Sequence, residues 1–255
     1  MDQVNKTLYI PLRGKAYVNR KGIILQDPWA EEIWAAEGFP LKGKSKSKWL
    51  AYYMGMRAAV FDRWAAARME EDPAAVILHI GCGLDSRCRR IGPHGNLWFD
   101  VDFPDVLAER RRYYQETETY RMIAADLTDP HWLESLPGGN AIVLLEGVSM
   151  YLHPEQLRQA LDRMAAHFDS VSVLMDCYTT FAARASKYRN PINDVGVTQV
   201  YGMDDPAVLE GFCCEHEMAP LDLVAELHGM ERKIFQTLYA GGVAKKLYRL
   251  YEYRR

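Results

Sequence analysis

The chain has 255 residues, of which 49% are hydrophobic and 25% charged, a composition typical of a folded protein with room for one large α/β domain. It carries 31 basic and 34 acidic residues, so its net charge of −3 gives no reason to expect nucleic acid or an anionic membrane as a partner. Its five cysteines lack the spacing of a disulfide framework, and no run approaches the ~20 apolar residues of a membrane helix. These features predict a cytoplasmic protein.

Two helices are predicted before residue 72. Residues 28–38 have a proline in the first turn and a glycine at the end, which is typical of helix boundaries. Residues 46–71 carry aromatic and aliphatic side chains at spacings of three, four and seven, which mark one face of a long amphipathic helix. The lysine-rich stretch 42–48 between them is expected to be a solvated loop. Residues 1–72 therefore form a predicted N-terminal helical segment.

From residue 75 onward, predicted strands and helices alternate. The strands are expected at 75–80, 96–101, 120–126, 141–146 and 170–176, and the helices at 104–118 and 154–167. Such alternation predicts a parallel sheet covered by helices on both faces. Two more strands at 212–218 and 245–255, with a helix near 220–229 between them, would complete the sheet, the last strand running antiparallel. We expect one domain over residues 1–255, in which 73–255 form a Rossmann-like core with a seven-stranded, mostly parallel sheet.

The loop after the first strand is a candidate ligand site, because open α/β sheets bind ligands at the carboxyl ends of their strands. Gly81 and Gly83 would let the backbone turn tightly and approach a ligand, although a purely structural turn explains them as well. Asp85 or Ser86 is expected to cap the next helix. Asp102 follows about twenty residues later, where an acid binds ribose hydroxyls in nucleotide-binding folds. Since position 86 is not the third glycine of a dinucleotide motif, the loop favours a single nucleoside.

Three further acids stand at the predicted ends of strands. Asp126 is placed to bind an adenine amino group, and Glu146 faces the cleft between the two halves of the sheet. Each acid has a helix cap as its alternative role, and for Asp176 we prefer that role. Such a ring of acids suits a ligand with a ribose, an amine and a sulfonium charge, and would repel the phosphates of a dinucleotide.

Several runs together resemble a known family. They are GCGLDSR, FDVDFP, AADL and LLEGVSMYL in the predicted core, and TLYIPLRGKA, QDPWAEE and YMGMRAAVFDRW in the helical segment. They are similar to the leucine carboxyl methyltransferase family, and within it to the bacterial polyketide O-methyltransferases of the tetracenomycin type. The resemblance covers roughly the first 180 residues. It implies a class I methyltransferase fold with S-adenosyl-L-methionine (SAM) as the cofactor.

The resemblance implies which residues bind the methionine part of SAM. Lys15 and Arg57 would bind its carboxylate, and Glu146 its amino group. Gly81 would contact the same part of the cofactor through its backbone, with Gly83 in the same loop. Taken without the resemblance, Lys15 and Arg57 are better explained as members of salt bridges on a helical surface.

The remaining implied contacts concern the nucleoside and the methyl group. Asp102 would bind the ribose, and Asp126 and Leu127 would hold the adenine. Tyr151 would line the methyl-transfer site and is the candidate catalytic residue.

The methyl acceptor is expected to be a small, polyketide-like molecule that offers a carboxylate or a hydroxyl group. A carboxylate is ionised at neutral pH and needs no general base, whereas a phenol does. No histidine ends a predicted strand, so the pattern favours a carboxylate. The side chains of Tyr178, Arg184, Lys187 and Arg189 are candidates to orient it, or else decorate a surface helix. The alternatives are a methyltransferase for protein C-terminal carboxylates and a SAM-binding partner subunit without catalysis.

Two other groups of residues are assigned structural roles. Cys213, Cys214 and His216 lack a second pair to complete a four-ligand metal site, so we expect a buried strand there and no metal. His79 lies inside the first predicted strand and is expected to be a hydrogen-bonded core residue.

Overall fold

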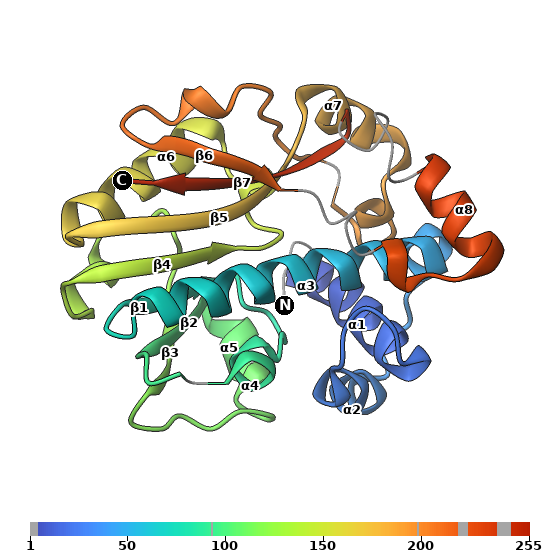
Figure 1. Cartoon of the computed structure of the whole chain (residues 1–255), viewed down its shortest axis with the longest axis horizontal. Coiled ribbons are helices and arrows are strands. Elements are labelled where there is room, and N and C mark those ends of the chain that lie inside the picture. The colour runs from blue at the N-terminus through green and yellow to red at the C-terminus, as the bar shows by residue number, and fades with distance from the viewer. Residues whose placement is uncertain (1–4, 93, 198, 219–223, 239–245) are drawn as a thin grey trace.

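The computed structural model describes residues 5–92, 94–197, 199–218, 224–238 and 246–255, and it contains one seven-stranded sheet with helices on both faces (Figure 1). The strands lie in the order β3-β2-β1-β4-β5-β7-β6. All adjacent pairs from β3 to β5 are parallel, and β7 is antiparallel to both β5 and β6. The predicted seven-stranded, mostly parallel sheet is thus confirmed. The strands are β1 (Val76–Ile80), β2 (Trp98–Asp102), β3 (Tyr120–Ala124), β4 (Asn140–Leu145), β5 (Ser170–Tyr178), β6 (Cys213–Met218) and β7 (Tyr248–Arg254).

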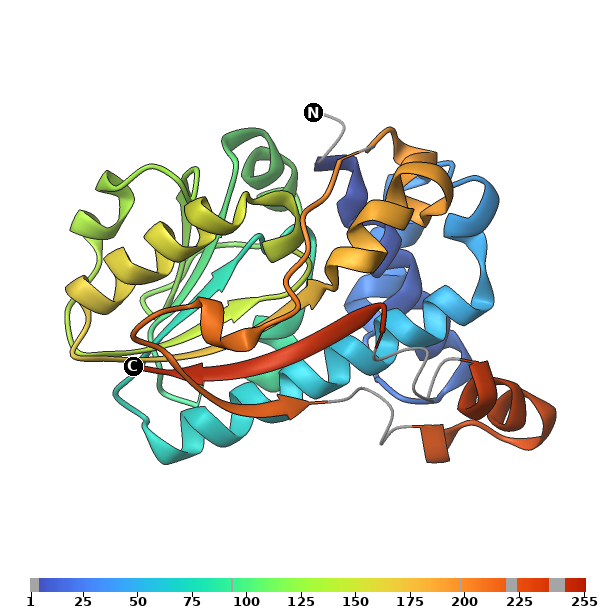
Figure 2. The same cartoon turned by 90° about the horizontal axis from the view of Figure 1, so that it is seen from above.

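The helices α1 and α2 of the N-terminal segment lie beyond the carboxyl ends of the parallel strands, together with α7 (Figure 2). The α-helices are α1 (Tyr9–Lys21), α2 (Pro28–Glu37), α3 (Lys48–Glu71), α4 (Arg87–Ile91), α5 (Pro104–Arg110), α6 (Pro154–His167), α7 (Thr180–Arg189) and α8 (Gly229–Leu238). Short 3-10 helices are η1 (Asn5–Leu8), η2 (Gly43–Lys46), η3 (His131–Ser135), η4 (Ser149–Tyr151), η5 (Pro191–Val195) and η6 (Pro206–Val208).

Local sequence explains the boundaries of α2. The Asp27 side chain accepts a hydrogen bond from the Ala30 amide at 2.9 Å, and Pro28 occupies the first turn, where its missing N–H costs nothing. Gly38 ends the helix in the left-handed conformation at φ 58°. The predicted helix 28–38 is confirmed.

The core lies on both faces of the sheet. On one face α3 packs through Phe61 and Trp64 against strand residues that include Ile77. On the other face α6 packs against strand residues that include Leu78. Ile77 and Leu78 are neighbours on β1 and point to opposite faces, as the period of a strand requires. The long helix α3 therefore belongs both to the N-terminal segment and to the cover of the sheet.

Several predicted boundaries were wrong. The helix expected over 104–118 ends at Arg110, whose side chain is fully buried and donates to the Asp100 carboxylate. β3 ends at Ala124, two residues early, and β5 continues through Asp176 to Tyr178. The stretch 42–48, expected as a loop, contains the short helix η2.

The last predicted helix falls elsewhere in the chain. Residues 219–223 of the expected helix near 220–229 lie outside the described residues, and the helix observed in this region is α8, which begins at Gly229. Among the described helices, none combines the length and the apolar character needed to cross a membrane.

Candidate functional site

A cavity of about 1130 Å³ opens between the carboxyl ends of the strands and the N-terminal helices. It brings together all nine residues predicted for the site, which are Lys15, Arg57, Gly81, Gly83, Asp102, Asp126, Leu127, Glu146 and Tyr151. This convergence requires the fold, because these residues come from α1, α3, η4, the end of β2 and the loops that follow β1, β3 and β4.

The glycine loop begins at the end of β1. Gly81 has φ +64°, and a Cβ atom at this position would lie 2.3 Å from Cγ2 of Val148. Gly83 has φ +51°. The loop thus combines a left-handed backbone with a close approach, both of which favour glycine. The prediction that Asp85 or Ser86 caps the next helix is wrong, because neither side chain caps α4. Asp85 binds Lys15, and Ser86 donates to Asp27.

Asp102 ends β2 with its carboxylate beside the glycine loop. Its two oxygens accept one hydrogen bond each, from the amides of Gly83 at 2.8 Å and Phe103 at 2.7 Å. Each oxygen therefore keeps a lone pair, which is what a pair of ribose hydroxyls requires. Burial raises the pKa of Asp102 to about 6, against the opposing effect of the two amides.

Glu146, directly after β4, lies in a buried ion-pair network. Its Oε1 accepts from Nε of Arg57 at 3.0 Å and forms an ion pair with Nη2 of the same guanidinium at 2.9 Å, and its Oε2 accepts from Arg87. These cations hold the pKa of Glu146 at about 2, although burial opposes them. Among the described residues, the two arginines account for three of the four acceptor positions of the carboxylate, which leaves one for a donor in the cavity.

Arg57 also binds a second carboxylate. Its Nη1 donates to Asp176 Oδ2 at 2.9 Å and to the Tyr248 hydroxyl at 2.7 Å. Asp176 further accepts from the Gly147 amide at 2.7 Å. The predicted role of Asp176 as a helix cap is therefore wrong: the residue lies inside β5, and Thr179 caps α7.

Both N-terminal cations are buried. Lys15 is 2% exposed and binds Asp85 at 3.0 Å, and Arg57 is 5% exposed. The alternative interpretation, in which Lys15 and Arg57 form salt bridges on a helical surface, is therefore wrong for both residues. Lys15 has two further N–H donors and Arg57 one, so together they have donors left for an anion that enters the cavity.

Asp126 and Leu127 follow β3. Asp126 is exposed, and its Oδ1 accepts from the amide and the hydroxyl of Thr128 at 2.8 and 2.7 Å. The residue lines the cavity. Leu127 is buried and adds an apolar surface beside it.

Four tyrosines, Tyr53, Tyr151, Tyr178 and Tyr248, also line the cavity. Tyr248 makes edge-to-face contacts with Tyr53 and Tyr178, at centroid distances of 5.6 and 5.2 Å. Burial raises the pKa of Tyr151, which also hydrogen bonds with Thr7, so its phenol stays protonated at neutral pH. We call this group the tyrosine wall.

Of the predicted acceptor-orienting residues whose side chains the structure describes, Tyr178 lies at the wall and Arg184 does not. Tyr178 lines the cavity, and its hydroxyl accepts from Asn190 at 3.1 Å. Arg184 is exposed and does not line the cavity, which agrees with the alternative role of a surface residue on a helix. The side chains of Lys187 and Arg189 lie outside the described part of the chain.

The two structural assignments had different outcomes. His79 is buried and hydrogen bonded to Asp100 at 2.9 Å, as predicted. The strand β6, expected to be buried, instead forms an exposed edge of the sheet: Cys213 is exposed, and His216 pairs with Glu252 at 3.1 Å.

Sequence reasoning missed Asp176, Tyr248 and Arg87. Asp176 was recognised as an acid but given the wrong role, and Tyr248 belongs to a strand recognised only by its alternation. Arg87 is the last residue of the run GCGLDSR, but no role was assigned to it. The signal that could have identified it is Glu146, an acid at the end of a buried strand, since a buried carboxylate needs a cation as partner.

Comparison with known proteins decides the family. The family model for leucine carboxyl methyltransferase matches residues 13–165. The chain belongs to the leucine carboxyl methyltransferase family. It is 33% identical over 210 residues to the tetracenomycin polyketide synthesis O-methyltransferase TcmP of Streptomyces glaucescens, covering 81% of this chain and 78% of that protein. It is also 30% identical over 183 residues to the SAM-dependent methyltransferase dpfgK of Gibberella zeae, covering 66% and 61%.

Solved structures agree on the fold. A DUF574 family protein from Streptomyces avermitilis has a TM-score of 0.58 at 15% identity, covering 95% of this chain and 97% of that one. The magnesium protoporphyrin IX methyltransferase of Synechocystis with bound S-adenosylhomocysteine (SAH) has a TM-score of 0.53 at 14% identity, covering 96% and 99%. By family and by fold, this member of the leucine carboxyl methyltransferase family is a SAM-dependent methyltransferase.

Proposed function

We propose that the chain transfers the methyl group of SAM to an oxygen of a small, polyketide-like acceptor, and that this oxygen belongs to a carboxylate. The observation that carries the proposal is one cavity whose lining combines paired charges with a group of four tyrosines. The similarity to TcmP, an O-methyltransferase of polyketide synthesis by its name, supports the same class of acceptor.

The unused hydrogen-bonding positions of the charged residues match the groups of SAM. In the proposed arrangement Asp102 binds the ribose diol and the last acceptor position of Glu146 receives the amino group. Lys15 and Arg57 donate to the carboxylate, while Asp126 and Leu127 contact the adenine. Gly81 and Gly83 allow the backbone to come close. When bound, SAM supplies a methyl group already activated by its sulfonium.

The tyrosine wall supports a carboxylate acceptor. The described cavity-lining residues of β5, α7 and η5 are Tyr178, Ala182, Ala185, Ser186, Asn190, Pro191 and Ile192. None of these can take a proton at neutral pH, and Tyr151 keeps its own. An acceptor that is already ionised needs only to be held with its oxygen roughly 3–3.5 Å from the methyl group. In the proposed arrangement, the tyrosine wall, which includes Tyr151, holds the acceptor in this position.

The cofactor assignment is tested by calorimetry with SAH and with NAD. The wild-type protein is expected to bind SAH and not NAD, because the acids around the cavity repel phosphates. Binding of NAD without binding of SAH would contradict the proposal.

The acceptor class is tested by a pH–rate profile at saturating SAM. With hydroxylated aromatic acids as acceptors, the rate is expected to change little between about pH 7 and 9, since a carboxylate is ionised throughout. A phenol, with a pKa near 10, would make the rate climb about tenfold per pH unit. Mild alkali should release methanol from the product, because it is a methyl ester. A base-stable methyl ether formed at a climbing rate would contradict the carboxylate acceptor.

A further inference from the structure

Arg87 is a buried cation that approaches the proposed cofactor site from behind. It has no exposed surface, and it is absent from the described residues that line the cavity. Its guanidinium donates to Oε2 of Glu146, on the side of that carboxylate opposite to Arg57. Any effect of Arg87 on the cofactor must therefore pass through the residues that it contacts, of which Glu146 is the one proposed to bind SAM.

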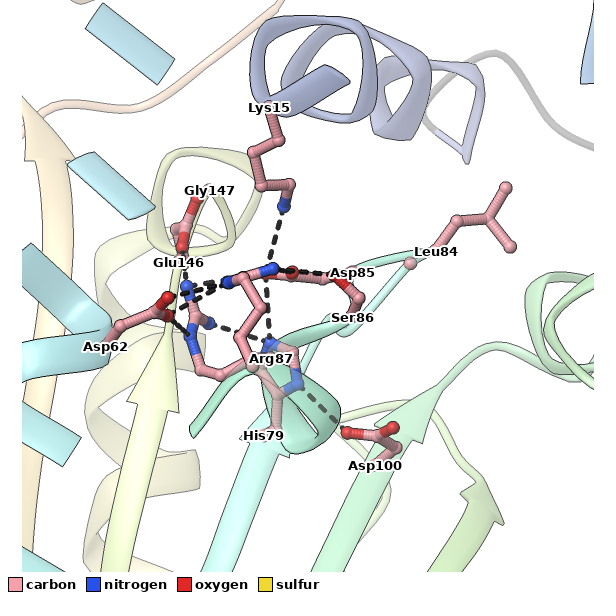
Figure 3. A network of polar contacts seen from close by, with 12 residues as sticks. Lys15, Asp62, His79, Leu84, Asp85, Ser86, Arg87, Asp100, Glu146 and Gly147 are labelled. Atoms are coloured by element: carbon pink, nitrogen blue, oxygen red, sulfur yellow. Dashed lines mark hydrogen bonds and ion pairs between the residues drawn. The ribbon is translucent and has the colours of Figure 1, made fainter. Parts of the chain in front are cut away.

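The guanidinium is fixed by groups from three other parts of the fold, as Figure 3 shows. Its Nε donates to Asp62 of α3 at 2.7 Å, and its Nη2 lies 3.3 Å from Asp85 in the glycine loop. Its Nη1 lies 3.0 Å from Nε2 of His79 in β1. Together with Glu146, these three residues give the guanidinium four partners, which fix its orientation.

His79 completes this arrangement through its tautomer. Arg87 can only donate, so Nε2 of His79 accepts, and the ring proton is on Nδ1, which donates to Asp100 at 2.9 Å. Burial also lowers the pKa of His79, which keeps the ring neutral. The ring therefore acts as a fixed acceptor for Arg87.

We propose that Arg87 is a positioning residue that holds the Glu146 carboxylate toward the amino group of SAM, an inference that rests on the proposed function of Glu146. The two arginines bind different oxygens of Glu146, and the residue itself lines the cavity. Only a planar fork with five donors reaches all four partners at once, so lysine cannot replace it.

Arg90 provides a matched control. It too is a buried arginine of α4, and it shares two partners with Arg87: its Nε donates to Asp62 and its Nη1 to Asp85, both at 2.7 Å. Its remaining contacts are with Asp27 and Ser86 rather than Glu146. If a substitution acts by damaging the shared network, variants of both arginines should lose SAH affinity. If it acts through Glu146, only the Arg87 variant should lose SAH affinity.

The experiment compares Arg87→Lys and Arg90→Lys by calorimetry with two ligands. SAH carries the amino group, and 5′-methylthioadenosine carries the same adenosine without it. Arg87→Lys is expected to weaken SAH binding about tenfold, the effect of one charge-assisted hydrogen bond, with 5′-methylthioadenosine binding unchanged. Arg90→Lys is expected to leave both affinities within about threefold of wild type. In a Glu146→Gln background, Arg87→Lys should have no further effect on SAH.

Three outcomes would overturn the inference: equal loss of SAH affinity in both lysine variants, equal loss of both ligands in Arg87→Lys, or an undiminished effect in the Glu146→Gln background. A wild-type protein that binds neither ligand would instead overturn the proposed function, and the inference with it. If Arg87→Lys does not fold, Asp62→Asn and Asp27→Asn serve as a milder pair. Asp62 anchors Arg87, whereas Asp27 contacts only Arg90 of the two arginines, so selective loss of SAH affinity in Asp62→Asn alone is expected.

Discussion

Replacing Arg57 with alanine is expected to lower the free energy of unfolding by about 3–5 kcal/mol and to weaken SAH binding at least about tenfold. The change leaves the Glu146 and Asp176 carboxylates buried beside each other without their shared cation. An unpaired buried charge is far more costly than a broken surface pair. Chemical denaturation at pH 7 and calorimetry measure the two effects.

Arg63→Ala is the control for this prediction. Arg63 lies on the same helix, its side chain is 65% exposed, and it pairs with Glu226 at 3.5 Å. Its removal should change the stability by less than about 1 kcal/mol. Arg57→Lys keeps the positive charge but loses the planar guanidinium with its several donors. Its loss of stability should lie between those of Arg57→Ala and Arg63→Ala. If Arg57→Ala proved as stable as Arg63→Ala and bound SAH as tightly as wild type, the buried network would have no role in either property.

The affinity for SAH is expected to fall about tenfold between pH 7 and pH 5, because Asp102 must be ionised to accept both ribose hydroxyls. Burial raises the pKa of this carboxyl to about 6, so the free protein takes up a proton there as the pH falls, and ligand binding must release it. The carboxyl and amino groups of SAH titrate outside this range. Calorimetry at several pH values measures the effect.

Asp102→Asn is the matched variant. It should bind SAH more weakly at pH 7 and show no change down to pH 5, because the titrating group is gone. A raised pKa also means that ionised Asp102 disfavours folding, an effect that grows as the pH rises from the ordinary carboxyl range through about 6. The variant should therefore be at least as stable as wild type at pH 7. A pH dependence of binding that persisted in Asp102→Asn would assign the titration to another group.

Much of the fold could be read from the sequence because its signals are local. Apolar runs that end in Gly81 or Asp102 mark buried parallel strands and the edge where their ends meet. The same signal placed Glu146 beside the cleft. It failed for Asp176, since the apolar run ends there but the strand does not: pairing with β7 carries β5 on to Tyr178.

The rest of the site depends on contacts between distant segments. Tyr248 lies opposite Tyr178 in the antiparallel register, seventy positions later in the chain, and this pairing brings its hydroxyl to Arg57. Arg87 acquires its role only when Asp62 of α3 lies against it. No periodicity within a single segment carries such information, so these residues became recognisable only through the packing of α3 and β7.

The position of β7 between β5 and β6 has a consequence for how the protein is made. Synthesis produces β6 before β7, yet β7 is the strand beside which β6 lies in the sheet. A growing chain that has reached β6 thus carries an unpaired strand and an open edge on β5, both prone to non-native pairing. It also lacks Tyr248 beside Arg57 and Asp176. The nascent chain can therefore close its sheet and complete its charged network only at the same late moment, when β7 leaves the ribosome.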